Sequence, residues 1–247
     1  MSHISPDDLL SLFADTADAV AGALNDLDDW GLAGTRLGQH HSDLAADRVA
    51  TNALLDAGLG VCSEESGLQA PDRSIIVVLD PLDGSTNAAQ GIPWYATSLC
   101  AVDDHGALAA LVVNLASGER YAATRGGGAH RDGEPIRPSA VTELSEAILG
   151  LSGWWPRAPR WRQYRALGAA ALDLCAVADG RLDGFADCHS LGPWDYLGAM
   201  LVCREAGAAV VDAAGRDLTT TDPLQRRTLL AAAGERLLAD LRAAWAG

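Results

Sequence analysis

The most constraining feature of this sequence is the stretch from Ile75 to Asn87, IIVVLDPLDGSTN. Its first five residues are apolar and rich in isoleucine and valine, which is typical of a strand buried on both faces. Pro81 and Gly84 then predict that this strand stops in a sharp turn. Because two carboxylates, a glycine and two hydroxyls crowd the turn, we expect oxygen ligands for a hard divalent cation and a phosphate at the end of a rigid strand.

Two other places in the chain carry acids at the end of a predicted element. Glu64 and Glu65 end a short strand, and because neighbours on a strand point to opposite faces, only one of them can aim at a given metal ion. Asp195 follows Pro193-Trp194 in the first turn of a predicted helix. A carboxylate there also suits the helix dipole, so capping alone could explain it.

Three segments of the chain resemble, in the same order, the three metal-binding motifs of the inositol monophosphatase superfamily: Glu64-Glu65, Asp80-Pro81-Leu82-Asp83-Gly84-Ser85 and Trp194-Asp195. The members of this superfamily are Mg²⁺-dependent phosphatases of the lithium-sensitive type. Matches at 126–129, 132–136 and 168–173 extend the resemblance over most of the chain. The resemblance implies an α/β (α+β) protein with the layered α-β-α-β-α sugar-phosphatase fold. We expect residues 1–140 to form a mostly antiparallel half with most metal ligands, and residues 141–247 to form an α/β half that carries Asp195.

The resemblance also implies roles for individual residues, with two or three Mg²⁺ per site. The expected metal ligands are Glu64, Asp80, the carbonyl of Leu82, Asp83 and Asp195. The expected catalytic residues, which orient the attacking water, are Glu64 and Ser85, with Asp47 polarising Ser85. The expected substrate contacts are Asp83, Gly84, Ser85, Gly168, Ala169, Asp187 and Asp195. Because the ligand side chains are all carboxylates, the set favours Mg²⁺ over Zn²⁺.

Three departures from the family pattern leave the substrate open. Ala169 lacks the hydroxyl that often follows Gly168 in the family, Asp187 is shorter than the glutamate of the inositol-cleaving members, and the loop before Asp47 is short. The expected substrate is inositol monophosphate or a similar small polyol phosphate. The alternatives are histidinol phosphate, phosphoadenosine phosphate or fructose bisphosphate, and a non-catalytic regulatory or binding protein that keeps the fold.

Charge and composition narrow the partners. A formal net charge of -15 argues against nucleic acid or an anionic membrane, and it makes bound cations a requirement for attracting a phosphate ester. No apolar run approaches the ~20 residues of a membrane span, and the first residues lack a secretory pattern, so we expect a cytoplasmic protein. Five cysteines without a CxxC pair predict reduced, buried thiols. The resemblance implies a homodimer.

Two segments have no assigned role. The loop before the second helix carries Arg36 and the pair His40-His41. Adjacent histidines could bind a cation, but they are also typical of a solvated loop. The segment Trp154 to Trp161 concentrates three of the seven tryptophans, and could form a substrate rim or a subunit contact.

Helical periodicity and capping residues predict helices over 6–27, 44–57, 168–177, 193–206 and 235–245, with Ser42-Asp43 as the cap of the second. Strands are predicted at 75–79, 95–102, 108–115, 120–124, 148–151, 183–187, 210–211 and 229–232.

Overall fold

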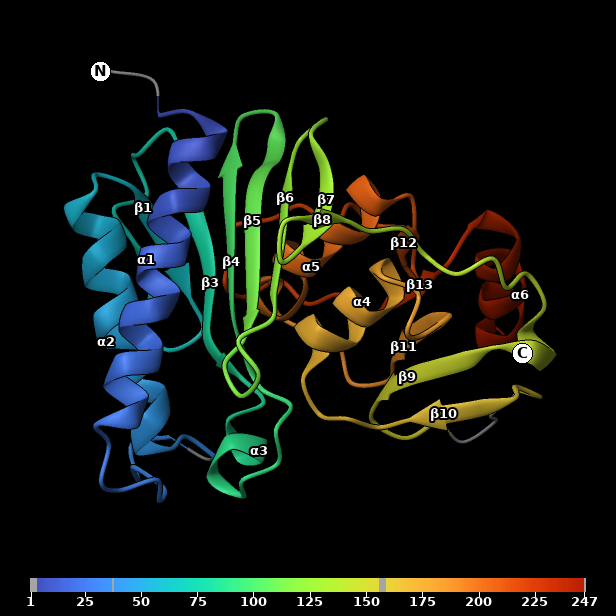
Figure 1. Ribbon diagram of the computed structural model, residues 1–247, viewed down its shortest axis with the longest axis horizontal. Coiled ribbons are helices and arrows are strands. Elements are labelled where there is room, and N and C mark those ends of the chain that lie inside the picture. Colours follow the sequence, from blue (N-terminus) through green and yellow to red (C-terminus); the bar gives the residue numbers. More distant parts are fainter. Residues whose placement is uncertain (1–3, 37, 156–158, 247) are drawn as a thin grey trace.

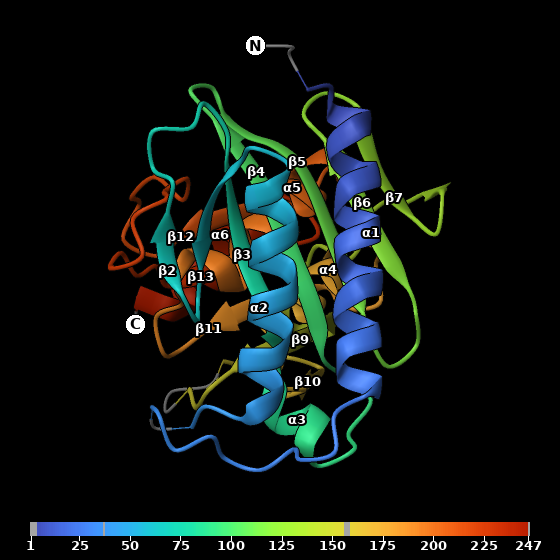
Figure 2. The ribbon, with the colours of Figure 1, turned by 90° about the vertical axis from the view of Figure 1, so that its left-hand side faces the viewer.

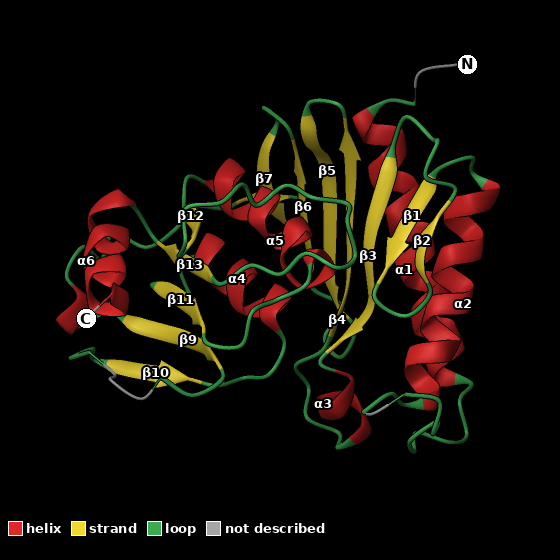
Figure 3. Cartoon of the chain, turned by 180° about the vertical axis from the view of Figure 1, so that it is seen from behind, coloured by secondary structure: helices red, strands yellow, loops and turns green. Residues whose placement is uncertain are grey.

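A computed structural model describes residues 4–36, 38–155 and 159–246, and these form five alternating layers. Helices α1 (Pro6–Asn25) and α2 (His41–Asp56) lie side by side on one face of the first sheet (Figure 2). Helices α4 (Ala170–Ala178) and α5 (Pro193–Ala206) lie between the two sheets, and α6 (Glu235–Ala246) covers the outer face of the second (Figures 1 and 3). The expected α-β-α-β-α layering is confirmed.

The first sheet has the strand order β2-β1-β3-β4-β5-β6-β7-β8. Its strands are β1 (Gly60–Ser63), β2 (Gly67–Gln69), β3 (Ile76–Asp83), β4 (Ala96–Asp103), β5 (Gly106–Asn114), β6 (Arg120–Thr124), β7 (Gly128–Arg131) and β8 (Glu134–Pro135). Neighbours pair antiparallel except β1 and β3, which are parallel, with Ser63 opposite Leu79. The carboxyl ends of β1 and β3 therefore lie side by side, so residues that follow them can converge.

Strand β3 continues through the proline, so the prediction that Pro81 stops it is wrong. The pairing of β3 with β4 is irregular between Asp80 and Asp83, which accommodates a residue that has no N–H to donate. The Pro81 carbonyl accepts a hydrogen bond from the Thr97 hydroxyl at 2.9 Å. The turn comes at Gly84, whose φ of 81° favours glycine.

The second sheet has the order β10-β9-β11-β13-β12. Its strands are β9 (Ile148–Ser152), β10 (Gln163–Arg165), β11 (Gly184–Asp187), β12 (Ala209–Asp212) and β13 (Leu229–Ala232). Strand β9 is parallel to β10 and β11, whereas β13 is antiparallel to β11 and β12. The predicted boundary near residue 140 falls between the two sheets. One apolar core nevertheless contains residues of both sheets, such as Val112 of β5 and Phe185 of β11, so the division into two domains stays a prediction.

The ends of the predicted helices agree with the sequence to within two residues, except at the start of α2. Helix α1 begins after a capping box in which Asp8 N–H donates to the Ser5 hydroxyl at 3.1 Å, and α5 ends at Gly207, with a φ of 95°. Helix α2 begins earlier than predicted, at His41. Ser42-Asp43 therefore lies inside the first turn, where the Asp43 carboxylate accepts the N–H of His40 at 2.7 Å.

Two residues of the tryptophan segment, Trp155 and Trp161, pack in the apolar core against α6. Trp155 is buried, and its ring centroid lies 5.8 Å from that of Trp161 and 5.0 Å from that of Trp245 in α6. Trp155 is therefore not available for a substrate rim or a subunit contact. Trp154, which is 76% exposed, is available for either. Residues 156–158 of this segment lie outside the described residues.

The cysteines are free, with Cys188 partly exposed and the other four buried, as expected for reduced thiols. Within the described ranges, the helices are too short or too polar to cross a bilayer.

Candidate active site

Three carboxylates converge where β1 and β3 end. An oxygen from each of Glu64, Asp80 and Asp195 lies within 4.8 Å of the others. Glu64 continues the ladder beyond β1, since its N–H donates to the Leu79 carbonyl at 3.1 Å. Asp195 comes from the first turn of α5 and also accepts the Gly192 N–H at 2.6 Å, so it caps the helix while facing the cluster. The sequence correctly predicts this convergence from three distant motifs.

The cluster is electrostatically unfavourable by itself. Burial, followed by repulsion from Asp195, raises the pKa of Glu64 to about 8. Burial, followed by repulsion from Asp83, raises the pKa of Asp195 to about 8. The pKa of Asp80 is also raised, by burial and by Glu64. Because like charges this close are stable only when protonated or offset by a cation, the residues fit a divalent metal bound by oxygen ligands.

Asp83 and Leu82 lie beside this cluster rather than in it. Asp83 Oδ2 accepts the N–H of Ala171 at 2.8 Å and so anchors the end of β3 to the start of α4. Burial nevertheless raises the Asp83 pKa to about 8. The Leu82 N–H donates to Asp80 Oδ1 at 3.0 Å, which orients that carboxylate. Ligation by Asp83 and by the Leu82 carbonyl stays a prediction.

The turn after β3 has no room for a side chain at Gly84. A Cβ there would lie 3.0 Å from the Trp94 carbonyl oxygen and 3.1 Å from the Gly168 carbonyl oxygen. Ser85 then begins the short helix α3 (Ser85–Ala89). Asn87, a residue that the sequence analysis missed, holds the turn in place: its amide donates to the carbonyls of Trp94 at 2.8 Å and Leu167 at 2.7 Å.

The carboxylate that meets Ser85 is Asp43, not the predicted Asp47. Views of the chain in Figures 1 and 2 place α3 at the end of the first sheet where α2 begins. There the Ser85 hydroxyl lies close enough to Asp43 to lower the pKa of that carboxyl, although burial, the larger effect, raises it overall. Asp47 lies one turn further along α2 and accepts hydrogen bonds from the hydroxyls of Thr51, Ser63 and Ser66 instead. Asp47 therefore holds α2 against the end of β1.

Glu65 is held by the loop that precedes α2. It accepts hydrogen bonds from Arg36 and from the amide of Gln39, and Arg36 also donates to the Glu64 carbonyl at 3.2 Å. Glu64 and Glu65 lie in the turn after β1 rather than on the strand, so it is these loop contacts, and not strand alternation, that hold Glu65 apart from the three-carboxylate cluster. Arg36, left without a role by the sequence, lies at the rim of the site.

A cavity of about 240 Å³ adjoins the cluster. Its walls are mostly small or acidic residues, among them Asp83, Gly168, Ala169, Asp173 and Asp195, together with Leu151 and Leu191. Gly168 and Ala169, two of the expected substrate contacts, line the cavity, and their contact with a substrate stays a prediction. Asp173, which it missed, is buried, has a pKa raised to about 7 by burial, and accepts the Trp94 indole N–H at 2.9 Å.

Asp187 does not line this cavity. It is fully buried at the end of β11, where its two oxygens accept the N–H groups of His189 and Ser190, each at 2.9 Å. The expected contact between Asp187 and the substrate therefore stays a prediction, and in this structure the carboxylate closes the turn after β11.

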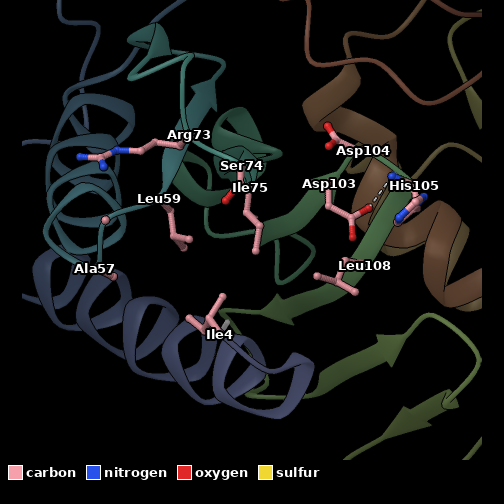
Figure 4. A pocket seen from close by; sticks show the side chains of 11 residues that line it. Ile4, Ala57, Leu59, Arg73, Ser74, Ile75, Asp103, Asp104, His105 and Leu108 are labelled. Atoms are coloured by element: carbon pink, nitrogen blue, oxygen red, sulfur yellow. Dashed lines mark hydrogen bonds between the residues drawn. The ribbon is translucent and has the colours of Figure 1, made fainter. Parts of the chain in front are cut away.

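A larger cavity, of about 550 Å³, lies at the opposite ends of the same two strands (Figure 4). Leu59 and Ile75 precede β1 and β3 and line it together with Ile4 and Leu108, while Asp104 and His105 lie at its edge. The predicted site residues all lie elsewhere, so the larger cavity is not the candidate active site.

Comparisons with known proteins agree with this geometry. The model of the inositol monophosphatase family matches residues 42–246. A fructose-1,6-bisphosphatase/inositol-1-monophosphatase from Archaeoglobus fulgidus is 37% identical over 206 residues, covering 78% of this chain and 79% of that protein. The inositol-1-monophosphatase SuhB of Mycobacterium tuberculosis is 37% identical over 190 residues, covering 68% of this chain and 64% of that protein. A Pyrococcus horikoshii structure, described as similar to inositol-1 monophosphatase, superposes with a TM-score of 0.83 at 25% identity and covers 96% of both chains.

Proposed function

The chain belongs to the inositol monophosphatase family and is a phosphatase, and from this premise we propose that it is a Mg²⁺-dependent phosphomonoesterase for inositol monophosphate or a similar small polyol phosphate. The observation that carries the proposal is the convergence of Glu64, Asp80 and Asp195 within 4.8 Å at the ends of two parallel strands. Burial makes these charges unfavourable unless a cation offsets them, which supports a metal-dependent reaction.

The metal ligands proposed are Glu64, Asp80, the Leu82 carbonyl, Asp83 and Asp195, for two or three Mg²⁺. Bound magnesium would supply an activated water and offset the charge of the phosphate. The protein's own part is to fix the ligands: β1 and β3 carry Glu64 and Asp80, and the first turn of α5 carries Asp195.

Ser85 and Asp43 form the proposed pair that orients the attacking water. Asp43 accepts the Ser85 hydrogen, which leaves the oxygen lone pairs of Ser85 free to accept from the water. Backbone N–H groups of Gly84 and Ser85 are the proposed phosphate donors, at the turn that Asn87 holds. In this proposal Asp43 takes the place first assigned to Asp47.

The cavity supports an uncharged polyol as the rest of the substrate. Arginine is missing from its described lining, which instead includes Asp83, Asp173 and Asp195. Asp83 and Asp195 are proposed metal ligands, so Asp173 is the acid left to face the rest of the substrate. A second phosphate would meet Asp173 without a counter-charge, whereas a hydroxyl group can donate to it, so the cavity favours a polyol over a bisphosphate. The mixed name of the Archaeoglobus fulgidus relative makes fructose 1,6-bisphosphate the comparison to test.

A homodimer and a cytoplasmic location stay predictions. Trp154, which is exposed and follows the end of β9, is available for a contact between subunits. Light scattering that shows a dimer for the wild type and a monomer for Trp154→Ala would support this use of the surface, and a wild-type monomer would contradict it.

The proposed activity is tested by phosphate release from a panel of inositol 1-phosphate, histidinol phosphate, phosphoadenosine phosphate and fructose 1,6-bisphosphate. We expect Mg²⁺-dependent turnover of the polyol monophosphate above the others, abolished by chelator. Asp72→Asn, on an exposed turn, is the control variant and should match the wild type. Mg²⁺ binding without turnover of any member of the panel would favour the regulatory alternative.

A further inference from the structure

The adjacent histidines before α2 have opposite surroundings. The His41 side chain is 43% exposed, and its Nε2 lies 3.6 Å from the exposed carboxylate of Asp29. The His40 side chain is only 12% exposed, and its Nδ1 is buried without a hydrogen-bond partner among the described residues. A buried polar atom without a partner is rare in folded proteins, so His40 requires an explanation that His41 does not.

His40 lies against the carboxylate that meets Ser85. Its main-chain N–H donates to Asp43 Oδ2 at 2.7 Å, and its Nδ1 lies 3.8 Å from the same oxygen. An isolated bridge to Leu32 fixes the backbone of His40 on its other side. The imidazole therefore needs only a small side-chain rotation to donate to Asp43.

We infer that His40 is a positioning residue that acts through Asp43, its Nδ1–H donating to the carboxylate and holding it toward the Ser85 hydroxyl. The inference rests on the proposed function, in which Ser85 orients the attacking water. Because the main-chain N–H and the ring of His40 both lie against Oδ2, they leave Oδ1 of Asp43 available to the Ser85 hydroxyl. The effect should therefore fall on turnover more than on substrate affinity.

Three substitutions separate this role from simple packing. His40→Asn places an amide nitrogen near the position of Nδ1 and is also a favourable residue before a helix. His40→Gln carries its amide further out, near the position of Nε2, and His40→Phe keeps a ring without a donor. His41→Phe is the matched control, because that side chain contacts Asp29 instead.

We expect His40→Phe and His40→Gln to lower kcat about tenfold, since one lost hydrogen bond to a carboxylate corresponds to roughly that ratio. KM should change less than kcat, His40→Asn should recover most of the loss, and His41→Phe should match the wild type. Thermal unfolding of each variant checks that it is folded.

Turnover of His40→Phe equal to that of the wild type would overturn the inference, as would a loss in His40→Asn as large as in His40→Phe. A wild type that is inactive on the whole substrate panel would instead contradict the proposed function. In that case ¹⁵N spectra of the histidine rings test the contact between His40 and Asp43 without an activity assay. We expect the signal of a hydrogen-bonded Nδ1–H for His40, and this signal should change in Asp43→Asn while the signals of His41 do not. A His40 spectrum insensitive to Asp43→Asn would overturn the inference.

Discussion

The two ends of the parallel pair β1 and β3 differ in whether the ionisable side chains there are exposed to water or buried. At the amino ends, Leu59 and Ile75 line the larger cavity, and the charged groups at its edge, Asp104 and His105, are exposed to water. At the carboxyl ends, Glu64 and Asp80 are brought together with a third carboxylate from α5 and are largely removed from water. Hydrated charges need no further explanation, whereas buried like charges do. The comparison indicates that the smaller, acidic end is the functional one.

Removing a carboxylate from each end should break the comparison most sharply. Asp80→Asn should lower kcat/KM by about 10³-fold or more, because it removes the proposed central metal ligand. Asp104→Asn, an equal change of charge at the other end, should have no effect. Steady-state phosphate release measures both, and an Asp80→Asn variant that kept more than a tenth of the wild-type activity would refute the assignment.

The packing at the two ends of β1 and β3 can be compared by adding one methyl group at each end. Gly58 and Gly84 both have positive φ, 83° and 81°, but a Cβ at Gly58 meets nothing within 4 Å, whereas one at Gly84 lies 3.0 Å from the Trp94 carbonyl. Gly58→Ala should cost about 1 kcal/mol of stability from backbone conformation alone. Gly84→Ala should cost about 3 kcal/mol and also lower activity, because the turn must move.

Denaturant unfolding monitored by tryptophan fluorescence gives both free energies. Equal losses for Gly58→Ala and Gly84→Ala would mean that the turn at Gly84 is not tightly packed.

Stability should depend on pH through the acidic end. Folding raises the pKa of Glu64 from 4.5 to about 8 and that of Asp195 from 3.8 to about 8, chiefly by burial. Between these values the folded state binds more protons than the unfolded state, so the free energy of unfolding falls as pH rises from about 4 to 8. In chelator, the melting temperature should therefore be higher at pH 5 than at pH 8.

Mg²⁺ should reverse this trend, because it binds the ionised carboxylates and raises the melting temperature more at pH 8 than at pH 5. Differential scanning calorimetry of the wild type and Glu64→Gln measures the effect, with Asp104→Asn as the control. A wild-type melting temperature that rose from pH 5 to pH 8 in chelator would contradict the account.

The smallest expected effect is at Ser85. Ser85→Thr keeps the hydroxyl of the proposed Ser85–Asp43 pair and adds a methyl group that restricts its rotamer. Activity should stay within about an order of magnitude of the wild type. Ser85→Ala, which removes the hydroxyl, is the comparison, and a Thr variant as poor as the Ala variant would mean that the hydroxyl is not what matters.

The sequence predicted those parts of the site that depend on local pattern. An apolar strand that runs into Asp80-Pro81-Leu82-Asp83-Gly84, and a proline that opens the helix of Asp195, each identify both an element and the residue at its end. Their convergence also depends on the parallel pairing of β1 with β3, which brings Glu64 to Asp80 and which the sequence analysis did not predict.

The choice between Asp43 and Asp47 needed the tertiary structure. The two residues are four apart on α2, so they share a face and differ by one helical turn, about 5.4 Å along the axis. Local context could not decide which of them reaches Ser85, because that depends on where the helix begins and how it packs on the sheet. The same holds for Trp155, whose partner Trp245 lies about 90 residues away in α6.

The central claim is that Glu64, Asp80 and Asp195 bind a divalent cation, and anomalous diffraction from crystals soaked in Mn²⁺, as a substitute for Mg²⁺, tests it most directly. The account predicts a strong anomalous peak between these three carboxylates, lost in crystals of Asp80→Asn. Well-ordered crystals of the wild type with no peak there, or with their strongest peak at the larger cavity beside Asp103 and Asp104, would contradict it.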